Sequence, residues 1–144
     1  MQNAAILAVS LRIPVGALVG AVGAGVSTGF AATRVVGIYV IPASAEFAGY
    51  VGMSTNVFGR LATHVGTTSG ATAGVTAAMA ARAEVYVLTS GPPSGVSLRA
   101  WLNIAEQRMI DSLGGKAALA NVVNPIGPAR SGLLRYNPSA VRIQ

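Results

Sequence analysis

Four side chains that can move protons or bind anions lie within one short stretch of this sequence. Tyr39 and Tyr50 lie near the ends of two adjacent predicted strands. Arg60 and His64 follow four residues apart, so on a helix they share a face. Taken singly, each has an ordinary explanation, as a half-buried sheet aromatic or as part of an exposed helix face. Together they would need a carboxylate and a basic surface to form a site.

One candidate carboxylate is Glu106, on the strongest predicted helix of the chain, residues 97–113, and an ordinary carboxylate of the helix surface is the alternative explanation. Apolar residues recur along this helix at helical spacing: Leu98, Leu102, Ala105, Met109 and Leu113. Glu106 lies next to this stripe, so we expect it at the edge of the core. Asn121 and Asn124 follow the helix, and both residue types are also common in turns.

The composition excludes several kinds of site. The chain has no cysteine, which rules out disulfides, thiolate zinc sites and a cysteine nucleophile, and which fits a cytoplasmic location. A single histidine rules out a two-histidine metal site. With four acidic residues, a two-metal carboxylate cluster is hard to build. A phosphoryl-transfer site would therefore use one metal together with arginine and tyrosine.

The charge favours a polyanionic partner. The 144 residues carry a net charge of +6, and Lys116 is the only lysine. Guanidinium groups match phosphate oxygens in a bidentate manner, so this excess suits a nucleic acid. Solubility, or a coding bias toward arginine, explains the same excess without any partner.

The pattern of apolar residues predicts an α+β domain. Val, Ile and Tyr are enriched in three predicted strands, residues 34–41, 49–53 and 84–89. A helix is predicted to begin after a cap at Ser54 or Thr55 and to run to about Val65. The expected fold is a small central three-stranded, largely antiparallel sheet flanked by helices.

Three segments are expected along the chain. Residues 1–33 form an apolar leader rich in Gly, Ala and Val, residues 34–128 form the domain, and residues 129–144 form a solvated basic tail. The leader is long enough to span a membrane, but its glycines and Pro14 disfavour a helix. A leader packed on the domain, a membrane-associated segment and an artefactual or disordered extension remain alternatives.

A set of short motifs occurs in a fixed order between about residues 35 and 125. They are Gly37-Ile38-Tyr39, Tyr50-Val51-Gly52, Ser54-Thr55-Asn56-Val57, Arg60-Leu61, His64, Glu106 and Asn121. This ordered set resembles the GIY-YIG endonuclease family. The sequence departs from the family pattern in four ways. Val51 replaces an isoleucine, residues 1–33 have no counterpart in the family domain, and Asn124 is a second asparagine close to Asn121. The basic residues are mostly arginine, whereas the family surface is often rich in lysine.

The resemblance implies hydrolysis of a DNA phosphodiester with one divalent metal, Mg²⁺ or Mn²⁺. Glu106 would hold the metal, and Arg60 would neutralise the phosphate at the transition state. Tyr39 would be the general base, which requires the metal or Arg60 to lower its pKa. Tyr50 and His64 would orient water or phosphate or assist proton transfer, and Asn121 would position the Glu106 region or the DNA.

Two other functions fit the same sequence. One is a catalytically silent nucleic-acid-binding module of the same fold, and the other is a membrane-associated form anchored by residues 1–33. Restriction, homing, repair and recombination are equally compatible with the motifs. The sequence also leaves open whether a partner or a homo-oligomer selects the target.

Overall fold

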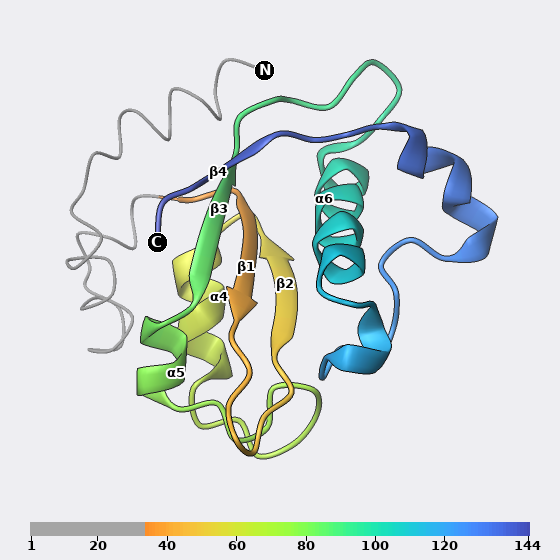
Figure 1. The fold of residues 1–144 in the computed structure, drawn as a ribbon. Helices are drawn as coiled ribbons and strands as arrows, with labels where there is room; N and C mark the ends of the chain where they lie inside the picture. Colours follow the sequence, from red (N-terminus) through yellow and green to blue (C-terminus); the bar gives the residue numbers. More distant parts are fainter. Residues whose placement is uncertain (1–33) are drawn as a thin grey trace.

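A computed structural model describes residues 34–144, so the predicted leader lies outside the described residues (Figure 1). The fold is α+β, and all strands of its sheet pair antiparallel in the order β2-β1-β3-β4. The strands are β1 (Gly37–Ile41), β2 (Tyr50–Ser54), β3 (Glu84–Leu88) and β4 (Ala140–Arg142). The α-helices of residues 34–144 are α4 (Val57–His64), α5 (Ala77–Ala81) and α6 (Leu98–Ser112). None of the helices within this range is long and apolar enough to cross a membrane.

Strand β1 lies inside the sheet, and all five of its residues are buried. Successive side chains of a strand point to opposite faces. Accordingly, Tyr39 and Ile41 pack in the core that includes Leu61 of α4, whereas Ile38 packs with Leu102 of α6. Figure 1 shows α4 and α5 on one side of the sheet and α6 on the other. Helices on both faces explain why the strand is apolar at every position.

The prediction of a three-stranded sheet is wrong, because the C-terminal segment adds a fourth strand. Val141 and Arg142 of β4 lie opposite Val87 and Tyr86 of β3, and the Ile143 amide donates to the Val85 carbonyl at 2.8 Å. The three residues of β4 are exposed, so no alternation of apolar and polar residues marks them as a strand. Backbone pairing along the otherwise open edge of β3 holds them in place.

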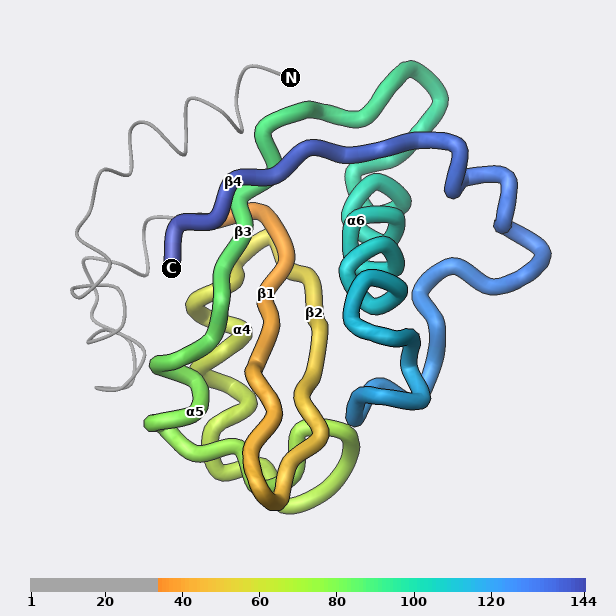
Figure 2. The backbone as a smooth tube through the Cα atoms, in the orientation of Figure 1, coloured from red at the N-terminus to blue at the C-terminus, as the bar shows by residue number. Residues whose placement is uncertain are grey.

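The C-terminal segment, predicted as a solvated basic tail, has no buried residue between 129 and 144 and is also hydrogen-bonded to α6. It forms a 3₁₀ helix, η2 (Pro128–Arg135), beyond the shorter η1 (Lys116–Ala118). The Arg108 guanidinium donates to the Tyr136 carbonyl at 2.9 Å and to that of Leu134, and the Tyr136 ring packs edge-on against Trp101. Figure 2 shows this segment passing from α6 back across to β3.

The helix ends depart from the sequence prediction in two places. Asn56, not Ser54 or Thr55, caps α4 by accepting from the Gly59 amide, and Ser54 instead accepts from the Asn56 amide. In α6 the predicted stripe is buried only in the middle, since Leu98 and Leu113 are exposed. A 15-residue helix is about 22 Å long, whereas a five-residue strand is about 17 Å long, so the ends of α6 extend past the sheet.

Candidate active site

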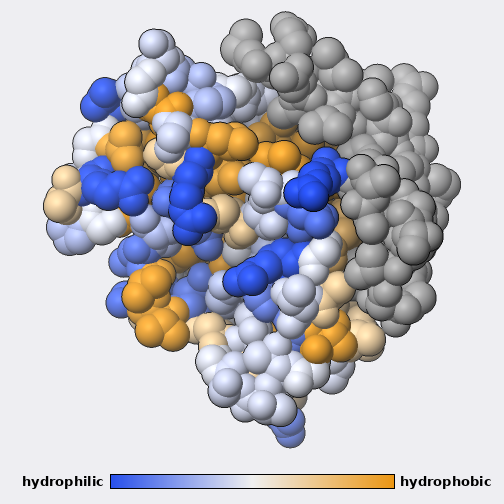
Figure 3. All heavy atoms as spheres, turned by 180° about the vertical axis from the view of Figure 1, so that it is seen from behind, coloured by the Kyte–Doolittle hydropathy of each residue, from blue (hydrophilic) through white to orange (hydrophobic). Residues whose placement is uncertain are grey.

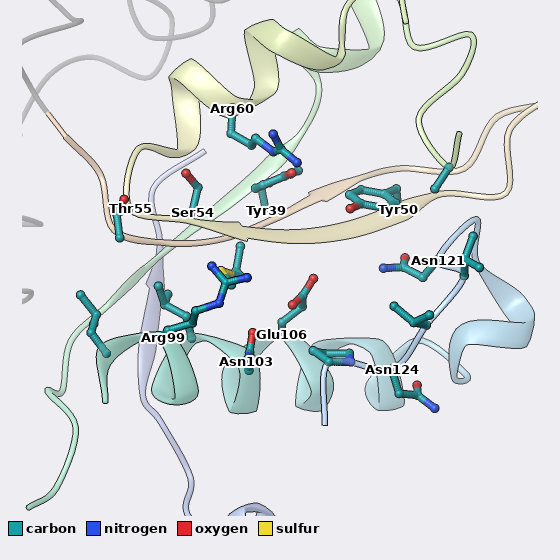
Figure 4. A pocket seen from close by; sticks show the side chains of 17 residues that line it. Tyr39, Tyr50, Ser54, Thr55, Arg60, Arg99, Asn103, Glu106, Asn121 and Asn124 are labelled. Atoms are coloured by element: carbon teal, nitrogen blue, oxygen red, sulfur yellow. The ribbon is translucent and has the colours of Figure 1, made fainter. Parts of the chain in front are cut away.

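A groove of about 950 Å³ runs around the open edge of β2 (Figure 4). It is lined by side chains from β1, β2, α4, α6 and the loop after η1. Five of the six predicted site residues line it: Tyr39, Tyr50, Arg60, Glu106 and Asn121. The sixth, His64, lies behind Tyr39 and contacts its hydroxyl. Residues from five separate segments of the chain are therefore brought to one place.

Two glycines of the motifs leave space for these side chains. A Cβ atom on Gly52 would lie 2.3 Å from both Cζ and Oη of Tyr39, so the tyrosine ring crosses β2 where a side chain is missing. A Cβ atom on Gly37 would lie 1.9 Å from the carbonyl oxygen of Tyr86 in β3. Gly37 therefore permits the close pairing of β1 with β3, and Gly52 permits the path of the Tyr39 ring.

Tyr39 and His64 form a buried hydrogen-bonded pair. Their Oη and Nε2 atoms are 2.6 Å apart, and the residues are 1% and 6% exposed. Burial, followed by the nearby Arg60 charge, lowers the pKa of His64 to about 4. The imidazole is then neutral at pH 7, and in the tautomer with its proton on Nδ1 the Nε2 atom accepts the hydrogen bond that the Tyr39 hydroxyl donates.

The same burial raises the pKa of Tyr39 above its ordinary value, and the neighbouring Tyr50 adds to this shift. Arg60 acts in the opposite direction but does not overcome burial. Figure 4 shows the Arg60 side chain reaching toward the Tyr39 hydroxyl from α4. Arg60 alone therefore does not bring the pKa of Tyr39 down toward neutrality, and the hydroxyl stays protonated at pH 7.

Tyr50 completes a cluster of three rings. Its ring centre lies 5.6 Å from that of His64 in an edge-on arrangement and 6.2 Å from that of Tyr39. Burial and the Glu106 charge raise the pKa of Tyr50, so this hydroxyl is also neutral at pH 7. Tyr50 can donate a hydrogen bond into the groove, where it lines the wall next to Asn121.

Glu106 is the carboxylate of the groove, and Figure 4 shows it pointing from α6 toward the sheet. Burial raises its pKa to about 7, and Arg99 opposes that shift. The only ion pair within residues 34–144 joins Arg142 and Glu84, so Glu106 has no cationic partner there within ion-pair distance. A half-buried carboxylate without such a partner is suited to a bound cation.

The ligands available near Glu106 fit only certain metals. Among residues 34–144 there is no group of three His, Asp or Glu side chains that could enclose a metal. A cation at Glu106 would have one protein carboxylate and would complete its coordination with water and substrate oxygens. Mg²⁺ is commonly bound in this way, so the residues present fit the expected Mg²⁺ and do not fit a structural zinc ion.

Asn121 holds the outer edge of β2. Its Oδ1 accepts from the Val51 amide at 2.9 Å, and its Nδ2 donates to the Val51 carbonyl at 2.8 Å. The side-chain amide thus pairs with the edge strand as another strand would, and it fixes the backbone next to Tyr50. Asn124 also lines the groove, but its side chain accepts from Gln107 of α6 at 3.2 Å and is not bonded to β2. Of the two asparagines, Asn121 has its side chain on the sheet side of the site.

The sequence reasoning missed three residues of α6. Arg99 and Asn103 line the groove beside Glu106, and their i, i+4, i+7 spacing places all three on one helix face. Gln107 is buried, where it donates to Asn124 and accepts from the Ile126 amide at 3.2 Å. The helical spacing relative to Glu106 identifies Arg99 and Asn103, but nothing in the sequence distinguishes Gln107 from a surface glutamine.

Comparisons of the chain with protein-family models, with curated proteins and with solved structures found no significant match. The likeness to the GIY-YIG family thus rests on the motif set of the sequence alone.

Proposed function

We propose that this protein is a divalent-metal-dependent DNA endonuclease of the GIY-YIG type, acting through one metal in the groove. The observation that carries the proposal is the meeting of the Tyr39–His64 pair, Arg60 and Glu106 around the edge of β2. Hydrolysis of a phosphodiester with one metal uses a proton acceptor for water, a positive charge near the phosphate and a metal ligand. These residues supply one of each. A cytoplasmic location goes with this proposal.

Proton transfer runs through the buried pair. The Tyr39 hydroxyl takes a proton from the attacking water while it passes its own proton to Nε2 of His64, 2.6 Å away. Because the pKa of Tyr39 is raised, a free tyrosinate is unfavourable, and a neutral acceptor behind the hydroxyl removes the need for one. The low pKa of His64 keeps the imidazole unprotonated at neutral pH.

Charge stabilisation falls to Arg60 and Glu106. The Arg60 guanidinium projects from α4 toward the Tyr39 hydroxyl, where the attacked phosphate would sit (Figure 4). A guanidinium fixed there stabilises negative charge as it develops on the phosphate. Glu106 would hold Mg²⁺ or Mn²⁺, which supplies stabilisation of the leaving oxygen when bound.

Features outside the reacting centre favour DNA as the substrate. Arg99 places a second guanidinium in the groove, across β2 from Arg60. The chain as a whole carries a net charge of +6. Figure 3, viewed from behind, shows strongly hydrophilic side chains gathered across the middle of that face, with apolar ones exposed beside them. The net positive charge of the chain attracts a polyanion in a salt-dependent way.

The test is plasmid nicking by the full chain in Mg²⁺ and in Mn²⁺, with matched variants. Glu106→Gln and Arg60→Gln are expected to lose nicking by about a hundredfold or more, the usual scale for a removed transition-state charge partner. Asp111→Asn on the same helix and Arg82→Gln beyond α5 lie outside the groove and are expected to nick like the parent. Equal nicking by all of these proteins would refute the proposal.

The same experiment separates the alternative function. Salt-sensitive DNA binding without nicking in either metal would favour a catalytically silent binding module. In that case Glu106→Gln would leave DNA affinity at or above the parental value, since it removes a negative charge from the groove.

A further inference from the structure

Three large apolar side chains lie exposed at the groove, Leu98, Val122 and Val123, and the two valines are adjacent in sequence. Val122 and Val123 are each 69% exposed, and both line the groove next to Asn121. They are the most exposed of the large hydrophobic side chains in residues 34–144. Single exposed aliphatic residues are common on protein surfaces, but two adjacent ones in a groove that also holds Arg60, Arg99 and Glu106 indicate a contact surface.

The loop that carries the valines is anchored on both sides. Before them, Asn121 is bonded twice to the Val51 backbone of β2. After them, the Ile126 amide donates to the buried Gln107 side chain of α6. The valines are therefore held at the rim between the sheet and α6, where they cannot easily fold back into the core.

A ligand in the groove contacts both positively charged and apolar side chains. It has to present anionic oxygens to Arg60 and Arg99, and an apolar face to Val122 and Val123. An unstacked nucleotide offers both, because its phosphate is charged and the face of its base is apolar. A second copy of this chain is a poor match, since each copy carries a net charge of +6.

We propose that Val122 and Val123 contact the exposed base of an unpaired or unstacked nucleotide beside the cleaved bond, so that the enzyme prefers DNA with interrupted stacking. This inference rests on the proposed function and specifies its substrate class. In a fully paired duplex the faces of the bases are covered by their neighbours, and an apolar side chain reaches them only after unstacking a base step. A bulge or a branch point has already lost that stacking.

The test compares the affinity for two duplexes of equal sequence, one of which carries an unpaired bulge. Glu106→Gln serves as the background, so that bound DNA is not cleaved. We expect about tenfold tighter binding of the bulged duplex, because the bulged base is already unstacked and binding requires no further free energy to unstack it. Val122→Ser with Val123→Ser should abolish this preference, whereas Val122→Leu with Val123→Leu should retain it. A 2-aminopurine in the bulge should change its fluorescence only with proteins that keep the apolar pair.

Val141→Ser is the matched control, because this valine is 48% exposed on β4 and lies outside the groove. It should leave the preference unchanged, and unchanged melting temperatures would show that all variants fold. Equal affinity of the background protein for both duplexes, or a preference that survives the serine pair, would overturn the inference while leaving the nuclease proposal standing. A dimer in sedimentation that the serine pair dissociates would also overturn it. No DNA binding at all would refute the proposed function itself.

Discussion

Replacement of Gly52 by alanine tests whether the Tyr39 ring depends on the missing side chain of β2. The added Cβ would lie 2.3 Å from Cζ and Oη of Tyr39, whereas ordinary contacts begin at 3.4 Å. The ring must therefore move by about an ångström. It cannot do so freely, because Tyr39 is buried and its ring packs beside those of Tyr50 and His64. Displacement of the ring would also break the Tyr39–His64 hydrogen bond.

The expected loss of stability follows from the displacement of the ring and the loss of its hydrogen bond. Overpacking of a core costs about 1–3 kcal/mol. An unsatisfied buried hydrogen-bonding group costs about 1–3 kcal/mol more. Against this, replacing glycine reduces the entropy of the unfolded chain and returns about 0.4–1 kcal/mol. We therefore expect Gly52→Ala to lower the free energy of unfolding by about 2–4 kcal/mol.

The assay is urea denaturation followed by fluorescence of Trp101, the single tryptophan, which is buried on α6. Gly127→Ala is the control, because its φ of −77° is ordinary and no atom would meet its Cβ within 4 Å. It should change the stability by less than about 0.5 kcal/mol. In a Tyr39→Ala background the obstructing ring is absent, so Gly52→Ala should cost little there. An equal cost of Gly52→Ala in both backgrounds would refute the reasoning.

Three further predictions concern the charges and bonds of the site. The pKa of His64 is about 4 in the folded protein and 6.5 in the unfolded chain. Between these two values the unfolded state binds more protons, so the free energy of unfolding decreases as the pH falls from 6.5 to 4. Relative to His64→Gln, the parent should lose up to about 3 kcal/mol between pH 6.5 and 4; parallel stability curves for the two proteins would contradict this. Glu106 has the opposite sign, because burial raises its pKa to about 7, and stability is lost as the pH rises through that value. Without metal, Glu106→Gln should therefore be more stable than the parent at pH 8 by about 1–2 kcal/mol, a value that allows for the partial exposure of the side chain. A variant less stable than the parent would show that burial does not destabilise the charged carboxylate. Asn121→Ala should lower the free energy of unfolding by about 1–2 kcal/mol and speed hydrogen exchange of the Val51 amide, whereas Asn124→Ala should leave that amide protected.

The sequence predicted those parts of the fold that have strong local patterns. β1, β2 and β3 fall within one residue or a few residues of the expected strands, since their Val, Ile and Tyr content is high. Ser97 was predicted to start α6 and does cap it, because a serine before an apolar period is a local feature. The fourth strand escaped prediction, since Ala140–Arg142 is short and exposed and is held only by long-range pairing with β3.

In the site, too, the features with local sequence patterns were predicted and the long-range contacts were not. Its six predicted residues came from ordered motifs, and the structure brings five of them into the groove with His64 behind. The direction of the pKa shift of Tyr39 was not predictable, because it depends on how deeply the ring is buried relative to its distance from Arg60. Nor does sequence spacing reveal that Asn121 bonds to the Val51 backbone, seventy residues away. Such contacts arise only when the loop after η1 returns to the sheet edge.

The most direct test of the account is the rate of DNA cleavage by Tyr39→Phe under single-turnover conditions in Mg²⁺. The substitution removes one buried oxygen atom and leaves the ring that fills the space over Gly52. Because this hydroxyl is proposed to relay the proton from water to His64, the cleavage rate should fall by about 10²–10⁴-fold. DNA affinity should stay within about threefold of the parent, since Arg60 and Arg99 are unchanged. Cleavage at the parental rate would contradict the proposed role of the Tyr39–His64 pair.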